Sequence, residues 1–164
     1  MESRAKALGH AVHPVLIVFP LGLLSTAVIF DVLYLITDRA SFATSAGHTM
    51  AAGIIGGVVA AVFGLIDWLV IPKGTRARRI GSLHGLGNAA VLVLFVISWL
   101  LRFSHDNWDP GMLAVICSVA GVGLAGATGW LGGELVERLG IGVDEGANVN
   151  APSSLTQKHP AKPA

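Results

Sequence analysis

The chain has 164 residues, of which 53% are hydrophobic and only 13% are charged, and its mean hydropathy is +0.69. Soluble domains typically carry about 25% charged residues, so this composition excludes disorder and argues against an ordinary water-soluble domain. The net charge of +1 provides no field that would select nucleic acid as a partner. The length allows one domain, and a single cysteine, Cys117, excludes an intrachain disulfide framework.

Four apolar stretches are long enough to cross a bilayer, which takes about 20 residues of helix. They run over residues 14–36, 50–71, 82–101 and 111–133, with Pro20 placed to bend the first. The connections are short, so consecutive helices should be antiparallel neighbours. We therefore expect an all-α protein, a four-helix transmembrane bundle with up-down-up-down topology, over residues 1–143. Residues 144–164 are polar and contain Pro and Ser, which predicts a disordered cytoplasmic tail.

The distribution of lysine and arginine predicts the orientation of this bundle. Nine of these residues precede the first stretch, lie between the second and third, or follow the fourth, whereas only Arg39 and Arg102 lie on the other side. Because basic residues accumulate in cytoplasmic loops, both termini and the basic loop of residues 72–79 should face the cytoplasm. The sequence thus predicts a multi-pass inner-membrane protein whose main partner is the lipid bilayer.

Small residues recur every three or four positions in two of the stretches. The second carries Gly53, Gly57, Ala60 and Gly64, and the fourth carries Gly121, Ala125, Gly129 and Gly133. Such patterns let helices approach closely in lipid, where apolar burial drives association only weakly. They predict seams inside one monomer or, alternatively, the face of a homodimer. Gly57 and Gly129 are both expected at helix contacts.

Ionisable side chains inside a span are costly in lipid, so each is a functional candidate. Four of them come from four different helices and fall within about two turns of the cytoplasmic boundary. These are His13, Asp67, His84 and Glu134, with His10 one turn before His13 and Asn88 one turn after His84. Asp31 and His48 lie near the other boundary, where they are expected to tie two helices together. For the two inner carboxylates, structural pairing of Asp67 with Arg76 and of Glu134 with Arg138 is the alternative.

Two histidines at similar depth on facing helices suit the axial ligation of a haem iron. The first and third helices run parallel and can face each other across the core, so His13 and His84 predict a haem b site. Their rings should point at each other, and Asp67 or Asn88 should accept the second ring N–H. Arg76, Arg78 or Arg79 would meet the haem propionates.

Other functions remain open beside a haem-binding or electron-transfer module. Five side chains offer mixed nitrogen and oxygen ligands for a divalent transition metal, namely His10, His13, His84, Asp67 and Glu134. The chain would otherwise bind no cofactor and act as a non-catalytic membrane scaffold or subunit. Because the sequence contains neither a nucleophile elbow nor H-E-x-x-H, a hydrolase is not expected, and a redox subunit is the enzymatic role left open.

Three segments together resemble one family of bacterial predicted membrane proteins, the domain of unknown function 2231. They are LGHAVHPVLIVFPLGLL at 8–24, GLIDWLVIPKGTRARRIGSLHGLGN at 64–88 and GWLGGELV at 129–136. The resemblance covers residues 8–143 and implies a small bacterial membrane module of four helices, without assigning an activity. Relatives of this type can be joined to a Rieske iron–sulfur domain, which associates the family with electron transfer and makes a redox partner one of the open alternatives. The family often has a further histidine before its Phe-Pro, where this sequence has Val18.

Overall fold

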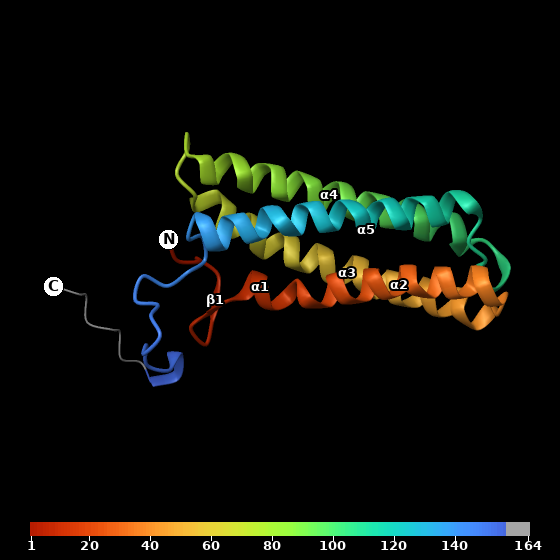
Figure 1. Ribbon diagram of the computed structural model, residues 1–164, viewed down its shortest axis with the longest axis horizontal. Coiled ribbons are helices and arrows are strands. Elements are labelled where there is room, and N and C mark those ends of the chain that lie inside the picture. The colour runs from red at the N-terminus through yellow and green to blue at the C-terminus, as the bar shows by residue number, and fades with distance from the viewer. Residues whose placement is uncertain (157–164) are drawn as a thin grey trace.

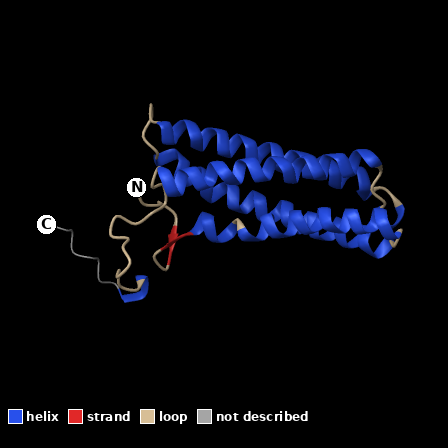
Figure 2. Ribbon diagram, viewed as in Figure 1, coloured by secondary structure: helices blue, strands red, loops and turns tan. Residues whose placement is uncertain are grey.

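The computed structural model describes residues 1–156, which are mostly helical (Figure 2). Its elements are β1 Lys6–Ala7, β2 His10–Ala11, α1 Val12–Leu16, α2 Val18–Thr37, α3 Ala40–Val70, α4 Arg76–Phe103, η1 Asp106–Trp108, α5 Met112–Gly133, η2 Glu134–Arg138 and η3 Ser154–Thr156. Among these described residues, four helical segments are long and apolar enough to span a membrane, which confirms the predicted number: Val12–Thr37, Ala40–Val70, Arg76–Phe103 and Met112–Arg138. The predicted tail, residues 144–164, lies partly outside the described residues.

The four long helices run up and down along the length of the molecule (Figure 1). The closest packing is between α2 and α3 and between α4 and α5, while α3–α4 and α2–α5 contacts join these two pairs. The first and third spans are therefore diagonal to each other. We call the end with the N-terminal segment, the α3–α4 loop and η2 the basic end, and the opposite end the distal end.

The first span contains a local irregularity near Pro20. α1 ends at Leu16 and α2 begins at Val18, with Ile17 between them. Pro20 has no N–H with which to bond the carbonyl of Leu16, so that one helical hydrogen bond is missing. Ile17 keeps helical dihedral angles, and its N–H and carbonyl still bond His13 and Leu21 at 3.1 Å. The bend that Pro20 predicts stays a prediction, and His13 lies on α1, the first part of this span.

Glycines form close seams in the middle of the bundle. A Cβ added to Gly53 would lie 2.7 Å from Leu24, one at Gly57 would lie 2.6 Å from Leu92, and one at Gly121 would lie 2.8 Å from a Phe95 ring atom. The side chains on the other side of these seams belong to the core cluster or pack against it: Leu24, Ala27, Met50, Val91 and Phe95, with Leu92 at its edge. The prediction for Gly57 is therefore confirmed.

The prediction for Gly129 is wrong. A Cβ added at Gly129 or Gly133 would meet nothing within 4 Å. The reason is geometric, because each four-residue step turns about 40° around a helix, so three steps carry the pattern about 120° away from Gly121. Thr128, seven residues after Gly121, returns to the inner face and is buried.

A fully buried ion pair joins the helices at the distal end. Arg102 Nη1 lies 2.5 Å from Asp31 Oδ1, and neither side chain is exposed to solvent. Ser118 donates to the other carboxylate oxygen at 2.9 Å, and Ser98 accepts from Arg102 at 2.9 Å. The expected tie between Asp31 and His48 is wrong, because the carboxylate pairs with Arg102 and Ser118. His48 instead lies against the Trp108 ring, 5.4 Å between centroids.

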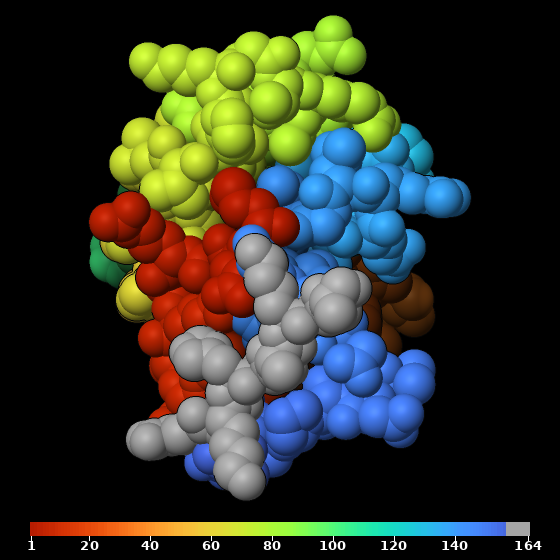
Figure 3. All heavy atoms as spheres, turned by 90° about the vertical axis from the view of Figure 1, so that its left-hand side faces the viewer, coloured from red at the N-terminus to blue at the C-terminus, as the bar shows by residue number. Residues whose placement is uncertain are grey.

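The N-terminal segment closes the basic end (Figure 3). Both carboxylate oxygens of Asp67 accept hydrogen bonds from the Ser3 hydroxyl at 2.8 Å, and the backbone N–H of Arg4 donates to Asp67 at 2.8 Å. Lys6 pairs with Glu2 and with Asp144, so the segment also contacts the chain that follows η2. The Lys6 ammonium group lowers the pKa of Asp144 below its usual range through this hydrogen bond.

Candidate functional site

His13 is held on α1 against the neighbouring helix α3. Its Nδ1 lies 2.8 Å from the carbonyl oxygen of Ala60. A Cβ added at Gly64, one turn further along α3, would lie 2.9 Å from His13 Cε1. The small residues of α3 therefore form a recess for the imidazole, and a larger side chain at Gly64 would push the ring out.

His84 is held in the same manner on α4, against α5. Its Nδ1 lies 2.8 Å from the carbonyl oxygen of Thr128, and a Cβ at Gly132 would lie 3.1 Å from its Cε1. Asn88 adds a second contact, with its Nδ2 at 3.3 Å from His84 Nε2. The Thr128 hydroxyl donates to Asn88 Oδ1 at 3.1 Å, which fixes the orientation of the amide.

The two imidazoles meet across the diagonal of the bundle. Their ring centroids are 6.4 Å apart and their planes are perpendicular. Because a backbone carbonyl only accepts hydrogen bonds, each neutral ring must carry its proton on Nδ1 and leave a lone pair on Nε2. Metal-binding histidines commonly show this arrangement, in which a carbonyl fixes the tautomer and the other nitrogen is the ligand.

The carbonyl partners were not foreseen from the sequence. We expected Asp67 or Asn88 to accept the second ring N–H, but that role belongs to the backbone of Ala60 and Thr128. Asp67 is committed to the N-terminal segment, and Asn88 is a donor to His84. A carbonyl acceptor leaves no signal in the sequence except the small residues that let the ring approach it.

The remaining candidate ligands lie apart from the histidine pair. His10 is exposed in β2, with Nε2 at 3.3 Å from the Ser154 hydroxyl. Glu134 accepts from Arg76 at 2.5 Å, so the expected pairing with Arg138 is wrong, as is that of Asp67 with Arg76. Within residues 1–156, no three His, Cys, Asp or Glu side chains are grouped so that they could hold a metal ion.

The basic residues near this end have different surroundings. Arg78 stacks 3.5 Å above the Trp68 ring and donates to the carbonyl of Ile71 at 3.2 Å, so it caps the end of α3. Arg79 precedes His84 by five residues, which at 100° per residue points the two side chains about 140° apart around α4. A role for Arg76 and Arg79 toward haem propionates therefore stays a prediction.

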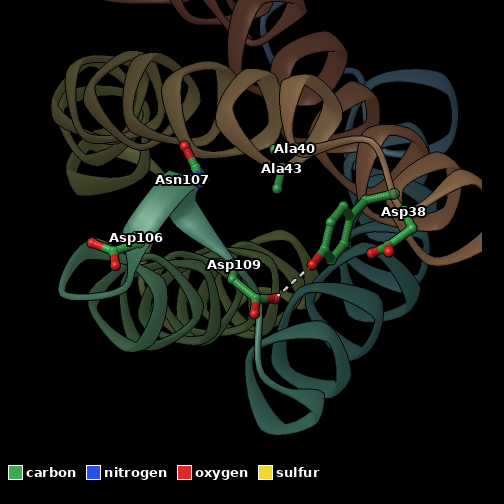
Figure 4. A pocket seen from close by; sticks show the side chains of 7 residues that line it. Asp38, Ala40, Ala43, Asp106, Asn107 and Asp109 are labelled. Carbon is green, nitrogen blue, oxygen red and sulfur yellow. Dashed lines mark hydrogen bonds between the residues drawn. The ribbon is translucent and has the colours of Figure 1, made fainter.

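Two surface cavities lie away from the histidines. One, of about 190 Å³, is at the distal end and is lined by Tyr34, Asp38, Ala40, Ala43, Asp106, Asn107 and Asp109 (Figure 4). Within it the Tyr34 hydroxyl donates to Asp109 at 3.0 Å. The second, of about 460 Å³, is at the basic end and is lined by Gly74, Thr75, Arg76, Arg78, Arg79 and Ser82.

These features define a four-helix membrane protein with one histidine pair between its diagonal helices. The family described as "Predicted membrane protein (DUF2231)" matches residues 9–145, most of the chain and all four spans. The chain belongs to this family, as the sequence motifs suggested. Comparison with curated proteins and with solved structures gave no match.

Proposed function

We propose that His13 and His84 are the axial ligands of a haem b, and that the chain is a small electron-transfer module of a bacterial inner membrane. The separation of the two rings, 6.4 Å between centroids, supports this proposal best. Two imidazoles that each bind one metal at about 2 Å have their centroids about 6 Å apart. The backbone carbonyls of Ala60 and Thr128 already hold both rings in the tautomer that such ligation needs.

The number of available ligands favours haem over a bare metal ion. The porphyrin of haem supplies four nitrogen ligands, so the protein needs to supply only two, whereas a structural zinc site takes four protein ligands. In the described part of the chain the histidine pair has no third His, Cys, Asp or Glu beside it. The recesses at Gly64 and Gly132 are filled by the imidazoles, and they fix where each ring lies.

Haem b, when bound, supplies a one-electron carrier. The protein's residues provide the surroundings that tune it. Nδ1–H donation to a carbonyl raises the basicity of each ligating nitrogen and fixes the ring against rotation. Asn88 donates toward His84 Nε2 at 3.3 Å, so its amide would have to turn aside for that nitrogen to hold a haem iron. In this role the module would pass electrons to a redox partner, with both termini in the cytoplasm.

Visible spectroscopy tests the proposal. The protein is purified in mild detergent and titrated with haemin, and we expect a Soret band that saturates at one haem per chain. His13→Ala and His84→Ala should each weaken haem binding strongly, while His10→Ala and His48→Ala serve as matched controls and should bind as the parent does. Circular dichroism checks that each variant is folded. Titration without saturation, or unchanged binding by both ligand variants, overturns the haem assignment.

A specific observation favours one other function, that of a membrane scaffold. His84, Asn88 and Thr128 form a hydrogen-bonded network between α4 and α5, and such polar contacts contribute to helix association in membranes. In this case the protein binds no haem, and Asn88→Ala loosens the α4–α5 contact by about 0.6 kcal/mol, the average for such bonds. The haemin titration together with the stability of Asn88→Ala separates the two functions.

A further inference from the structure

The cavity at the basic end is formed by the α3–α4 loop and the first two turns of α4. Three of its six lining residues are arginines: Arg76, Arg78 and Arg79. The same region forms the upper part of the face seen in Figure 3, beside the N-terminal segment. A concave surface with this much positive charge fits an anion, and guanidinium groups in particular suit phosphate oxygens.

The three arginines are not equally free to bind a ligand. Arg78 is occupied, because its guanidinium stacks on Trp68 and donates to the end of α3. Arg76 shares its charge with Glu134. Arg79 is exposed and has no acidic partner among residues 1–156. Arg79 is therefore the guanidinium available to a ligand, the charge of Arg76 is partly neutralised, and Arg78 forms part of the cavity wall.

The surface of α4 below Arg79 is apolar. Leu83, Leu86 and Val93 follow Arg79 by 4, 7 and 14 residues, and each is more than half exposed. These spacings keep the three side chains within about 40° of Arg79 around the helix. A charged cavity thus continues directly into a stripe of exposed apolar side chains that runs toward the middle of the membrane span.

We propose that this cavity binds the phosphate of an anionic phospholipid, with the acyl chains along Leu83 and Leu86. A free phosphate shares the chemistry of the headgroup, but it has no acyl chains that could contact Leu83 and Leu86. A zwitterionic lipid shares the acyl chains but carries a choline that the arginines repel. Only the anionic phospholipid matches both parts of the surface, and basic pockets beside transmembrane helices commonly bind such headgroups.

Native mass spectrometry of the detergent-solubilised full chain, titrated with phosphatidylglycerol or phosphatidylcholine, measures this binding. We expect phosphatidylglycerol to bind at least tenfold more tightly. Arg79→Gln should weaken its binding about fivefold, the effect of one basic residue near a charged membrane surface. Arg39→Gln, which removes the same charge at the distal end, should leave binding unchanged. Glu134→Gln frees Arg76 and should tighten binding, a gain that misfolding would not produce.

The source of the phosphate is distinguished by two further measurements. Leu86→Asn should weaken phosphatidylglycerol binding, and 10-fold molar excess of inorganic phosphate over the lipid should not displace it. Displacement by phosphate together with no effect of Leu86→Asn would assign the cavity to a free anion and overturn the lipid proposal. Equal binding of the two lipids, or an effect of Arg39→Gln as large as that of Arg79→Gln, would overturn it as well.

Discussion

Removing one partner of the buried Asp31–Arg102 pair should destabilise the protein more than any surface change. Asp31→Leu removes the carboxylate that pairs with the buried Arg102 guanidinium, and it leaves the Ser118 hydroxyl with only the Val115 carbonyl as acceptor. Breaking a buried pair in this way typically costs about 3–5 kcal/mol. We expect the lower end, about 3 kcal/mol, because Arg102 lies in the last turn of α4 and its long side chain can turn toward water.

A double-mutant cycle separates the ion pair from the loss of packing. Asp31→Leu, Arg102→Met and the double variant are compared with the parent by SDS-induced unfolding in mixed micelles. Replacing a whole buried pair with apolar residues is often neutral or stabilising, so the double variant should return to within about 1 kcal/mol of the parent. If each single variant costs less than about 1 kcal/mol and the two effects simply add, Asp31 and Arg102 do not form the buried pair described here.

Three further predictions concern packing, the N-terminal segment and topology. Gly57→Leu should lower the free energy of unfolding by about 1–3 kcal/mol, because the added side chain overpacks the seam. Gly129→Leu should change the free energy of unfolding by less than about 0.5 kcal/mol, because nothing lies near that position. Similar losses for the two variants would contradict the seam assignment. The lowered pKa of Asp144 means that its contact with Lys6 is present above pH 3.8 and is lost as the pH falls further. The protection of amides near Asp144 against hydrogen exchange, relative to their intrinsic rates at each pH, should therefore fall on acidification, and Lys6→Gln should abolish that dependence. A reporter fused after Gly74 should be cytoplasmic and reporters in the other two connections periplasmic, and any reversal refutes the orientation.

Hydropathy predicted the four spans because the bilayer imposes helix length directly on the sequence. The side chains that contact each other across helices were predicted less well, because these contacts depend on which face of each helix points toward its neighbour. The four-residue spacing of Gly121, Ala125, Gly129 and Gly133 looks like one face but turns away from the contact after Ala125. A rule of spacing alone cannot detect this drift until the position of the neighbouring helix is known.

The polar residues show the same limit in another form. His13 and His84 were expected to face each other because the first and third spans are parallel, and their rings do lie 6.4 Å apart. Asp67 was expected beside them, yet the N-terminal segment lies next to Asp67 and supplies nearer donors. Arg102 was counted only as a basic residue that indicates orientation, because the neighbouring sequence does not distinguish an arginine that reaches the membrane surface from one that is buried.

The coordination state of the haem-loaded protein tests the central proposal most directly. Electron paramagnetic resonance of the ferric form reports whether two nitrogen ligands bind the iron. If His13 and His84 are both ligands, the parent protein gives a low-spin signal, and the haem that His84→Ala still binds gives a high-spin signal. A high-spin signal from the parent, or a low-spin signal that persists in both His13→Ala and His84→Ala, would contradict the assignment of this pair.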